Sequence, residues 1–167
     1  FECFNQALAQ NNETKKYLNK LGVKKVKLLG NLKFSETKIK TKKDLDGSLK
    51  IFFRSKKIWC ASSTHDNEEI ISAIAHKNLK KKFKNLVTII IPRHINRVDA
   101  IIKEIENLGL IIHLHSSKNK IKRNTEIYIV DTYGETEKFF NICKTVFLGG
   151  SLIKHGGQNP LEPARLG

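Results

Sequence analysis

The sequence predicts an α/β fold, a Rossmann-like doubly wound parallel sheet. Several short segments rich in β-branched residues have the length of strands, and segments with helical periodicity lie between them. The segment 86–91 is hydrophobic or β-branched throughout rather than alternating, which is typical of a strand covered on both faces. The repeated order strand, helix, strand favours a parallel sheet with helices on both sides.

The individual helices and strands are predicted from the spacing of their apolar residues and from residues, such as glycine, that end a helix. In the segment 70–83 the residues Ile70, Ile71, Ile74 and Phe83 predict a helix. The segment 98–108 has apolar residues at helical spacing and ends before a glycine. The predicted strands are residues 26–29, 57–61, 86–91, 110–115, 126–130 and 145–148.

Three segments do not fit this alternation of strands and helices. Residues 1–22 are predicted to be helical and to end at Gly22, and the Lys-rich segment 35–56 is expected to be an irregular connector with a short helix. A last helix is expected to begin near Pro160, so that it has barely two turns before Gly167. We therefore expect the domain to be incomplete at its C-terminal end.

Composition excludes several classes of protein. No apolar run reaches the roughly 18–20 residues that span a bilayer, and no secretory signal pattern opens the chain. The three cysteines are widely spaced without a CxxC pair, so neither a disulfide framework nor a zinc site is indicated. This cysteine usage favours a reducing cytoplasm.

The formal net charge of +15 admits two interpretations. It can indicate an anionic partner, such as nucleic acid, anionic lipid or a phosphorylated substrate. It can also reflect composition alone, because 26 of the 31 basic residues are Lys and the chain is rich in Ile and Asn. The lysines are not interleaved with aromatic residues as in nucleic-acid motifs, so no nucleic-acid partner is expected.

Polar residues follow four of the predicted strands, where ligands bind in an open parallel sheet. After the segment 145–148 come two Gly pairs and then Asn159, which can cap a helix that begins with Pro160. Glu162 can complete this capping arrangement, or accept hydrogen bonds from a ribose, and the helix N-terminus can bind phosphate. The candidate ligand-binding residues at this end are Gly150, Ser151, Gly157, Asn159, Pro160, Leu161 and Glu162.

The other three strand ends supply further candidates. Arg93, after a buried strand, suits a phosphate or base edge, or else a surface ion pair. Thr132 and Glu135 have the spacing of a capping box, and Gly134 between them leaves the first amides uncovered. His65 and His94 can act as acid, base or phosphate contacts. No HExxH, GxSxG, GxGxxG or P-loop motif occurs, so hydrolase, metal and dinucleotide interpretations are weak.

Five segments together resemble the bacterial 3-deoxy-D-manno-octulosonic acid (Kdo) transferases. The most specific runs from Gly149-Gly150-Ser151-Leu152 to Gly156-Gly157-Gln158-Asn159-Pro160-Leu161-Glu162-Pro163-Ala164. One departure is Asn67, where the family usually has Gly. The other four segments, in family order, are Gly30-Asn31-Leu32-Lys33-Phe34, Ser63-Thr64-His65 with Glu68-Glu69, Pro92-Arg93-His94 with Arg97, and Asp131-Thr132-Tyr133-Gly134-Glu135.

The resemblance implies the C-terminal, donor-binding half of a GT-B glycosyltransferase. It implies that residues 23–167 bind CMP-Kdo, while 1–22 lead in from an acceptor domain that lies upstream. The CMP contacts implied are Pro92, Arg93, Tyr133, Gly134, Glu135, Asn159, Pro160, Leu161 and Glu162. Further donor-site candidates are Ser63, Thr64, His65, His94, Gly150, Ser151 and Gly157.

The same resemblance implies what the chain does not carry. The general base would be a Glu of the upstream domain, so the chain alone should bind donor without transferring it; otherwise Glu68 or Glu135 would be the first candidate bases. The implied acceptor is a lipid A precursor, lipid IVA, at the cytoplasmic face of the bacterial inner membrane, with release of CMP and without a cofactor or metal. The alternatives are a basic binding module for an anionic polymer or membrane, and a GT-B transferase that uses another nucleotide sugar.

Overall fold

The computed structural model describes residues 3–32, 44–154 and 156–165. The chain divides into two compact units, Phe1–Thr41 and Lys42–Gly167. This division lies later in the chain than the boundary after Gly22 that the sequence suggested. Part of the segment 35–56, expected to be a connector, lies outside the described residues.

In the first unit, the described residues 3–32 form a strand–helix–strand motif. Strand β1 (Ala7–Ala9) pairs in parallel with β2 (Val26–Leu28), and α1 (Asn12–Lys20) connects them. The helix begins where the side chain of Asn11 accepts a hydrogen bond from the backbone N–H of Thr14 at 2.7 Å. The prediction of helix throughout 1–22 was therefore wrong at β1. Its Ala-Leu-Ala sequence favours helix locally, but pairing with a distant strand overrides that preference.

The second unit contains the doubly wound sheet. Its strands have the order β5-β6-β4-β3-β7, and all of the pairs are parallel. Strand β2, which was expected to belong to this sheet, is instead part of the first unit. The elements are α2 (Gly47–Arg54), β3 (Lys57–Thr64), α3 (Glu68–Lys82), β4 (Leu86–Pro92), α4 (Val98–Glu106), β5 (Ile112–Leu114), β6 (Ile127–Ile129), α5 (Thr136–Phe140), β7 (Val146–Leu148) and α6 (Leu161–Ala164), with a 3-10 turn at Ile95–Arg97.

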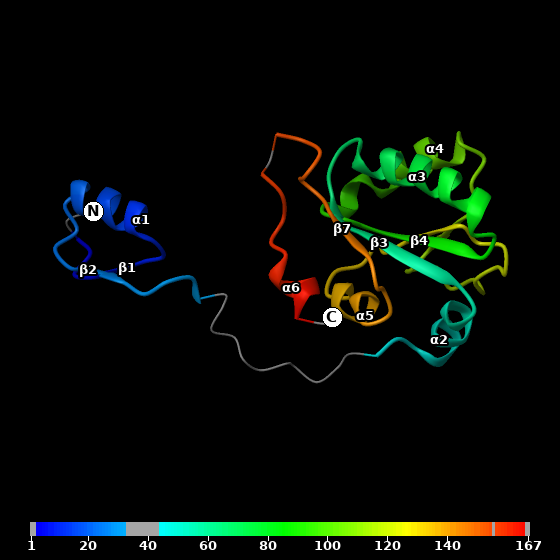
Figure 1. The fold of residues 1–167 in the computed structure, drawn as a ribbon, viewed down its shortest axis with the longest axis horizontal. Helices are drawn as coiled ribbons and strands as arrows, with labels where there is room; N and C mark the ends of the chain where they lie inside the picture. Colours follow the sequence, from blue (N-terminus) through cyan, green and yellow to red (C-terminus); the bar gives the residue numbers. More distant parts are fainter. Residues whose placement is uncertain (1–2, 33–43, 155, 166–167) are drawn as a thin grey trace. The chain divides into compact units, whose positions relative to one another are not determined.

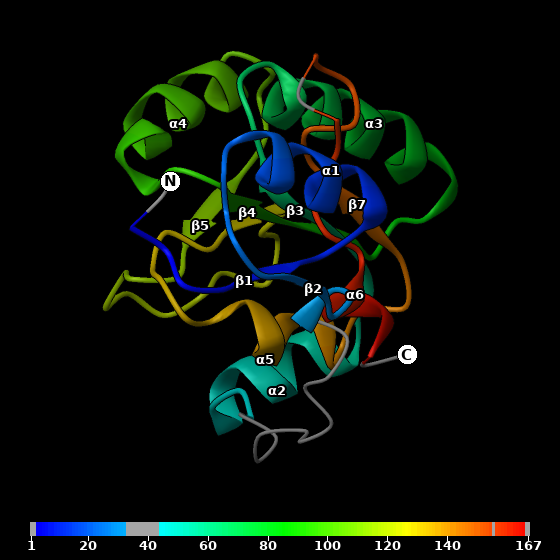
Figure 2. The same ribbon diagram turned by 90° about the vertical axis from the view of Figure 1, so that its left-hand side faces the viewer.

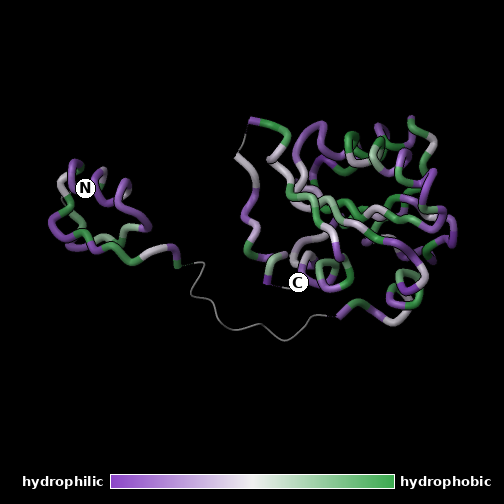
Figure 3. The backbone as a smooth tube through the Cα atoms, viewed as in Figure 1, coloured by the Kyte–Doolittle hydropathy of each residue, from purple (hydrophilic) through white to green (hydrophobic). Residues whose placement is uncertain are grey.

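Helices cover both faces of this sheet, as the buried pattern of β4 predicted. All seven residues of β4 are buried. Val87, Ile89 and Ile91 pack in the cluster formed with α2 and α5, whereas Ile90 packs with α3 and α4. The two helical layers lie on opposite sides of the sheet (Figures 1 and 2), and the hydrophobic segments lie between them (Figure 3).

The order of the strands places a switch point between β3 and β7. From β3 the chain crosses through α3 to β4 on one side, while β7 pairs with the other side of β3. In open α/β sheets, ligands bind at such a point, beyond the carboxyl ends of the strands. The topology therefore directs attention to the residues that follow β3, β4 and β7.

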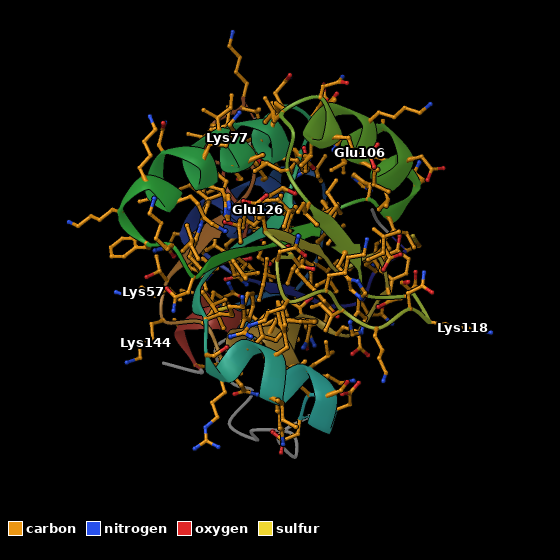
Figure 4. All side chains as sticks on the ribbon, turned by 90° about the vertical axis from the view of Figure 1, so that its right-hand side faces the viewer. Lys57, Lys77, Glu106, Lys118, Glu126 and Lys144 are labelled. Atoms are coloured by element: carbon orange, nitrogen blue, oxygen red, sulfur yellow. The ribbon has the colours of Figure 1, made fainter. Side chains whose placement is uncertain are left out.

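The lysines of the second unit are spread over several elements. Lys57, Lys77, Lys118 and Lys144 lie on β3, α3, the β5–β6 connection and the segment before β7 (Figure 4). The Lys77 ammonium donates to the carbonyl oxygen of Leu108 at 2.9 Å. Such a distribution is what a composition rich in Lys produces on a solvated surface. Within the described parts of the chain, no helix has the length and apolar character needed to cross a membrane.

Candidate functional site

A cavity of about 200 Å³ opens at the carboxyl ends of β3, β4 and β7. It lies at the switch point of the sheet, which is where the topology predicts a ligand. Its lining includes residues from the end of β3, from the residue after β4, from α5, from the end of β7 and from the segment around the start of α6. These lining residues are Ser62, Ser63, Arg93, Phe140, Leu148, Gln158, Asn159, Glu162 and Pro163.

The first wall of the cavity is the end of β3, which is longer than the sequence indicated. The polar run Ser62-Ser63-Thr64 was expected to be a loop, but pairing with β4 continues to Thr64 across a register shift. Ser63 has a φ of 54° at this irregularity. Ser62 and Thr64 are buried and Ser63 is half-buried. Because of the bulge, Ser63 lines the cavity whereas Thr64 is buried.

The second wall is Arg93, which directly follows β4. Its backbone N–H donates to the carbonyl oxygen of Thr64 at 2.9 Å, so its backbone is tied to the end of β3. Its side chain is exposed, and among the described residues its guanidinium forms neither an ion pair nor a hydrogen bond. Of the two interpretations open for Arg93, the surface ion pair is thus not found among those residues.

The third wall is held in place by backbone hydrogen bonds of the glycine loop. Gly149 N–H donates to Ser62 at 2.8 Å, while the carbonyl oxygens of Gly149 and Gly150 accept from Gln158 at 3.0 Å and from Gly157 at 2.8 Å. Gly150 and Gly157 have positive φ values of 76° and 78°, which only glycine adopts without strain. Ser151, by contrast, is exposed and bonds its hydroxyl to the carbonyl oxygen of Leu148 at 2.6 Å.

Asn159 and Glu162 differ in their roles at the start of α6. The side chain of Asn159 accepts from the backbone N–H of Leu161 at 3.1 Å. The predicted capping position was nevertheless off by one residue, because α6 begins at Leu161 and its N-cap is Pro160 rather than Asn159. Glu162 is exposed and forms no hydrogen bond to the described residues, so the reciprocal half of the capping arrangement is absent there. Pro160 immediately precedes this four-residue helix. Glu162 therefore leaves its carboxylate available at the cavity.

Two histidines and a glutamine form a polar group beside the cavity. The Nε2 atoms of Gln158 and His65 lie 2.9 Å apart, and the rings of His65 and His94 meet edge to face with centroids 5.9 Å apart. Sequence analysis did not select Gln158, although it lies within the Gly-Gly-Gln-Asn-Pro segment that it recognised. Its position between Gly157 and Asn159, which were both selected, could have indicated that Gln158 also belongs to the site.

The Tyr133-Gly134-Glu135 segment does not line this cavity. Tyr133 is 71% exposed. The predicted capping box was wrong, because Glu135 binds Lys138 at 2.5 Å and approaches His115 at 3.5 Å instead of capping α5. Burial raises the pKa of the Glu135 carboxyl, but the hydrogen bond and charge of Lys138 outweigh it, so the pKa lies below its ordinary value. Glu135 is thus an ionised group in a local ion pair.

The chemistry available at the cavity is that of anion and hydroxyl recognition. Arg93 supplies a cation, and Asn159 and Glu162 supply amide and carboxylate groups beside a close backbone approach. A guanidinium matches the geometry of a phosphate, and a carboxylate accepts from ribose hydroxyls. Within the described ranges, no group of three or more potential His, Cys, Asp or Glu ligands is gathered for a metal ion.

Comparisons with known proteins identify relatives of this chain. No protein-family model matches the sequence. The chain is 33% identical to the 3-deoxy-D-manno-octulosonic acid transferase of Haemophilus influenzae over 158 residues, which is 93% of this chain and 37% of the relative. It is 35% identical over 158 residues to the transferase of that name from Rickettsia conorii, which is 94% of this chain and 34% of that protein.

A solved structure agrees with these sequences. The C-terminal CMP-Kdo binding domain of WaaA from Acinetobacter baumannii superposes with a TM-score of 0.64 at 33% identity, covering 69% of this chain and 60% of that one. This chain belongs to the Kdo transferase family. The Rossmann-like fold expected for the donor half of a GT-B enzyme is confirmed by this likeness. The chain spans about a third of the length of the curated Kdo transferases that it matches.

Proposed function

We propose that this chain is the donor-binding part of an enzyme that transfers Kdo from CMP-Kdo to a lipid A precursor, lipid IVA, and releases CMP. The observation that carries the proposal is the Arg93 guanidinium, which has no ion pair or hydrogen bond to the described residues, at a switch-point cavity also lined by Asn159 and Glu162. The likeness to a CMP-Kdo binding domain supports the choice of nucleotide. The enzyme would be a glycosyltransferase of lipopolysaccharide biosynthesis.

In the proposed complex, each wall of the cavity has a separate task. Arg93 binds the phosphate of CMP, and Pro92, which is buried at the end of β4, fixes the direction in which its neighbour leaves the strand. Glu162 accepts from the ribose hydroxyls, while Asn159 keeps the start of α6 in place. Tyr133, Gly134 and Glu135 follow β6, next to β4 in the sheet, and would complete the nucleotide contacts from that side.

The proposed reaction breaks the bond between the anomeric carbon of Kdo and the phosphate oxygen of CMP. An acceptor hydroxyl attacks that carbon from the opposite side, so the configuration inverts, and the electron pair of the broken bond leaves with the phosphate. Arg93 stabilises this developing charge, which is the usual role of a preorganised cation in such transfers. In this proposal the cation is supplied by the protein, so the reaction is assigned no metal or organic cofactor.

The proton of the acceptor hydroxyl requires a base outside the described site. Glu68 is fully buried, with both of its oxygens accepting backbone hydrogen bonds, and Glu135 is ion-paired. Neither is suited to remove a proton from a bulky lipid acceptor. We therefore assign the base, the lipid acceptor site and association with the cytoplasmic face of the inner membrane to an upstream domain, from which residues 1–22 would lead in.

Calorimetric titration with CMP tests the donor site. The wild-type chain should bind CMP more tightly than UDP or GDP, and Arg93→Ala should weaken CMP binding by about 1.5–3 kcal/mol, the scale of a charge-assisted hydrogen bond. Arg123→Ala is the matched control, because Arg123 is exposed and does not line the cavity. Wild-type affinity in Arg93→Ala would contradict the assignment.

The same titration separates the alternatives. Tighter binding of UDP or GDP would indicate a GT-B transferase for another nucleotide sugar. A polyanion-binding module would ignore CMP and bind DNA or anionic vesicles with a steep dependence on salt. Transfer itself is tested by assaying Kdo transfer to lipid IVA with and without the upstream domain. Transfer by the chain alone would contradict the proposed location of the base.

A further inference from the structure

Glu68, the first residue of α3, is a buried carboxylate that the proposed site does not use directly. Its relative exposure is 0%, equal to that of its neighbour Glu69. The two are held in different ways. Glu69 faces the guanidinium of Arg97 at 3.0 Å, whereas no Lys or Arg among the described residues forms an ion pair with Glu68. A buried carboxylate without a cation requires strong hydrogen bonds to remain charged.

Glu68 obtains those bonds from backbone amides of two separate segments. One oxygen accepts from the N–H of His65 at 2.9 Å and of Gly150 at 2.8 Å, and the other accepts from the N–H of Leu152 at 3.0 Å. Gly150 and Leu152 lie more than 80 residues further along the chain, as the separations of 82 and 84 show. The carboxylate therefore connects the start of α3 to the loop after β7.

That loop in turn positions the cavity. Gly150, which donates to Glu68, accepts from Gly157 at 2.8 Å, and Gly149 accepts from Gln158 at 3.0 Å. Gln158 is followed directly by Asn159, and both line the cavity. His65, the other backbone donor to Glu68, has its ring 2.9 Å from the Gln158 side chain. The Glu68 carboxylate thus holds both residues of the His65–Gln158 contact in place: it binds the His65 backbone directly, and it binds the glycine loop that in turn binds Gly157 and Gln158.

We propose that Glu68 is a positioning residue of the donor site, which sets the geometry of the 149–152 loop and through it the placement of Gln158 and Asn159 in the lining of the nucleotide cavity. The proposal rests on the proposed function for the identity of the ligand, CMP, but the contact between Glu68 and the loop is independent of it. A carboxylate is needed because two oxygens must accept three N–H groups, and an amide side chain has only one acceptor oxygen.

The decisive variant is Glu68→Gln, compared with Glu69→Gln as the matched control. Both replace an equally buried carboxylate in the first turn of α3, but only Glu68 contacts the loop. We expect Glu68→Gln to speed hydrogen exchange at the Gly150 or Leu152 amide and to weaken CMP binding by about tenfold, the loss of one good hydrogen bond. Glu69→Gln should leave both readouts unchanged at temperatures below its melting transition.

Several results would overturn the proposal. Unchanged loop exchange or unchanged CMP affinity in folded Glu68→Gln would do so, and so would equal losses in Glu69→Gln, which would indicate only general destabilisation. If Glu68→Gln does not fold, exchange in the wild-type chain decides, because rapid exchange at both Gly150 and Leu152 contradicts the proposed contact. Failure of the wild-type chain to bind CMP would instead refute the proposed function, and the exchange data would still test the role of Glu68 in the loop.

Discussion

A Cβ atom at Gly149 would lie 2.1 Å from the carbonyl oxygen of Ser63. The two backbones meet where β3 ends and the loop after β7 begins, and Gly149 N–H donates to Ser62 beside that contact at 2.8 Å. No side chain fits there without displacing the end of β3. Close approach of the two backbones, rather than an unusual φ, is therefore what requires glycine at this position.

Gly149→Ala should lower the free energy of unfolding by about 3 kcal/mol, because the added methyl group meets backbone atoms that cannot rotate away. Chemical denaturation measures this loss. Gly47→Ala is the control, since Gly47 opens α2 and a Cβ added there would have no heavy atom within 4 Å. That change should alter stability by less than about 1 kcal/mol. Equal effects at both positions would contradict the steric explanation.

Asn67 occupies a position that favours glycine for a different reason. Its φ is 68°, in the left-handed region, which Asn tolerates better than most residues. Asn67→Gly should therefore change the free energy of unfolding by less than about 1 kcal/mol, whereas Asn67→Ala should destabilise by about 1 kcal/mol. Denaturation of the three proteins side by side measures the difference. A stable Asn67→Ala variant would show that the backbone there relaxes.

His76 should make stability depend on pH. It is fully buried, with Nδ1 2.8 Å from Thr88 Oγ1, and burial lowers its pKa from 6.5 to about 4, with Lys80 acting in the same direction and Glu126 opposing. Between these values the unfolded chain binds a proton that the folded chain does not. Stability should therefore fall as the pH decreases from 6.5 to about 4, by at most about 1.4 kcal/mol per pH unit.

Comparing wild type with His76→Gln isolates this contribution. Other groups titrate in the same range, so the quantity to measure is the difference between the two denaturation free energies at each pH. The free energy of unfolding of the wild type should fall relative to that of the variant as the pH decreases. A difference that does not vary with pH would mean that His76 is protonated equally in both states.

Asn159 and Glu162 should separate structural capping from ligand binding. Asn159→Ala removes the bond to the Leu161 amide and should cost about 1 kcal/mol or less of stability. Glu162→Gln should weaken CMP binding and leave the melting temperature of the free chain unchanged, because its side chain has no hydrogen bond to the described residues. Scanning calorimetry and titration with CMP measure the two effects. Unchanged affinity in Glu162→Gln would remove Glu162 from the ribose site.

Local patterns were sufficient for much of the second unit. The uninterrupted segment 86–91 is within β4 and is buried throughout, and the helical spacing of 98–108 corresponds to α4, whose apolar face contains Val98, Ile101 and Ile105. These predictions succeeded because burial on one or both faces leaves its period in the sequence. The end of β4, which Arg93 follows directly, was located by the same pattern.

Only the tertiary structure decided the features that depend on distant pairing. β1 is a strand because β2 lies beside it. Ser62 extends β3 because it pairs with both β4 and β7, and Thr64 does so because it pairs with β4. The approach of His115 to Glu135 was likewise hidden, since His115 lies at a neighbouring strand end, whereas the ion-pair partner Lys138 is only three residues away. Glu68 and Gly150, which are joined by a hydrogen bond, lie 82 residues apart in the sequence. A hydrogen bond between a backbone amide and a distant carboxylate produces no periodic pattern in a single sequence, so it could not be predicted.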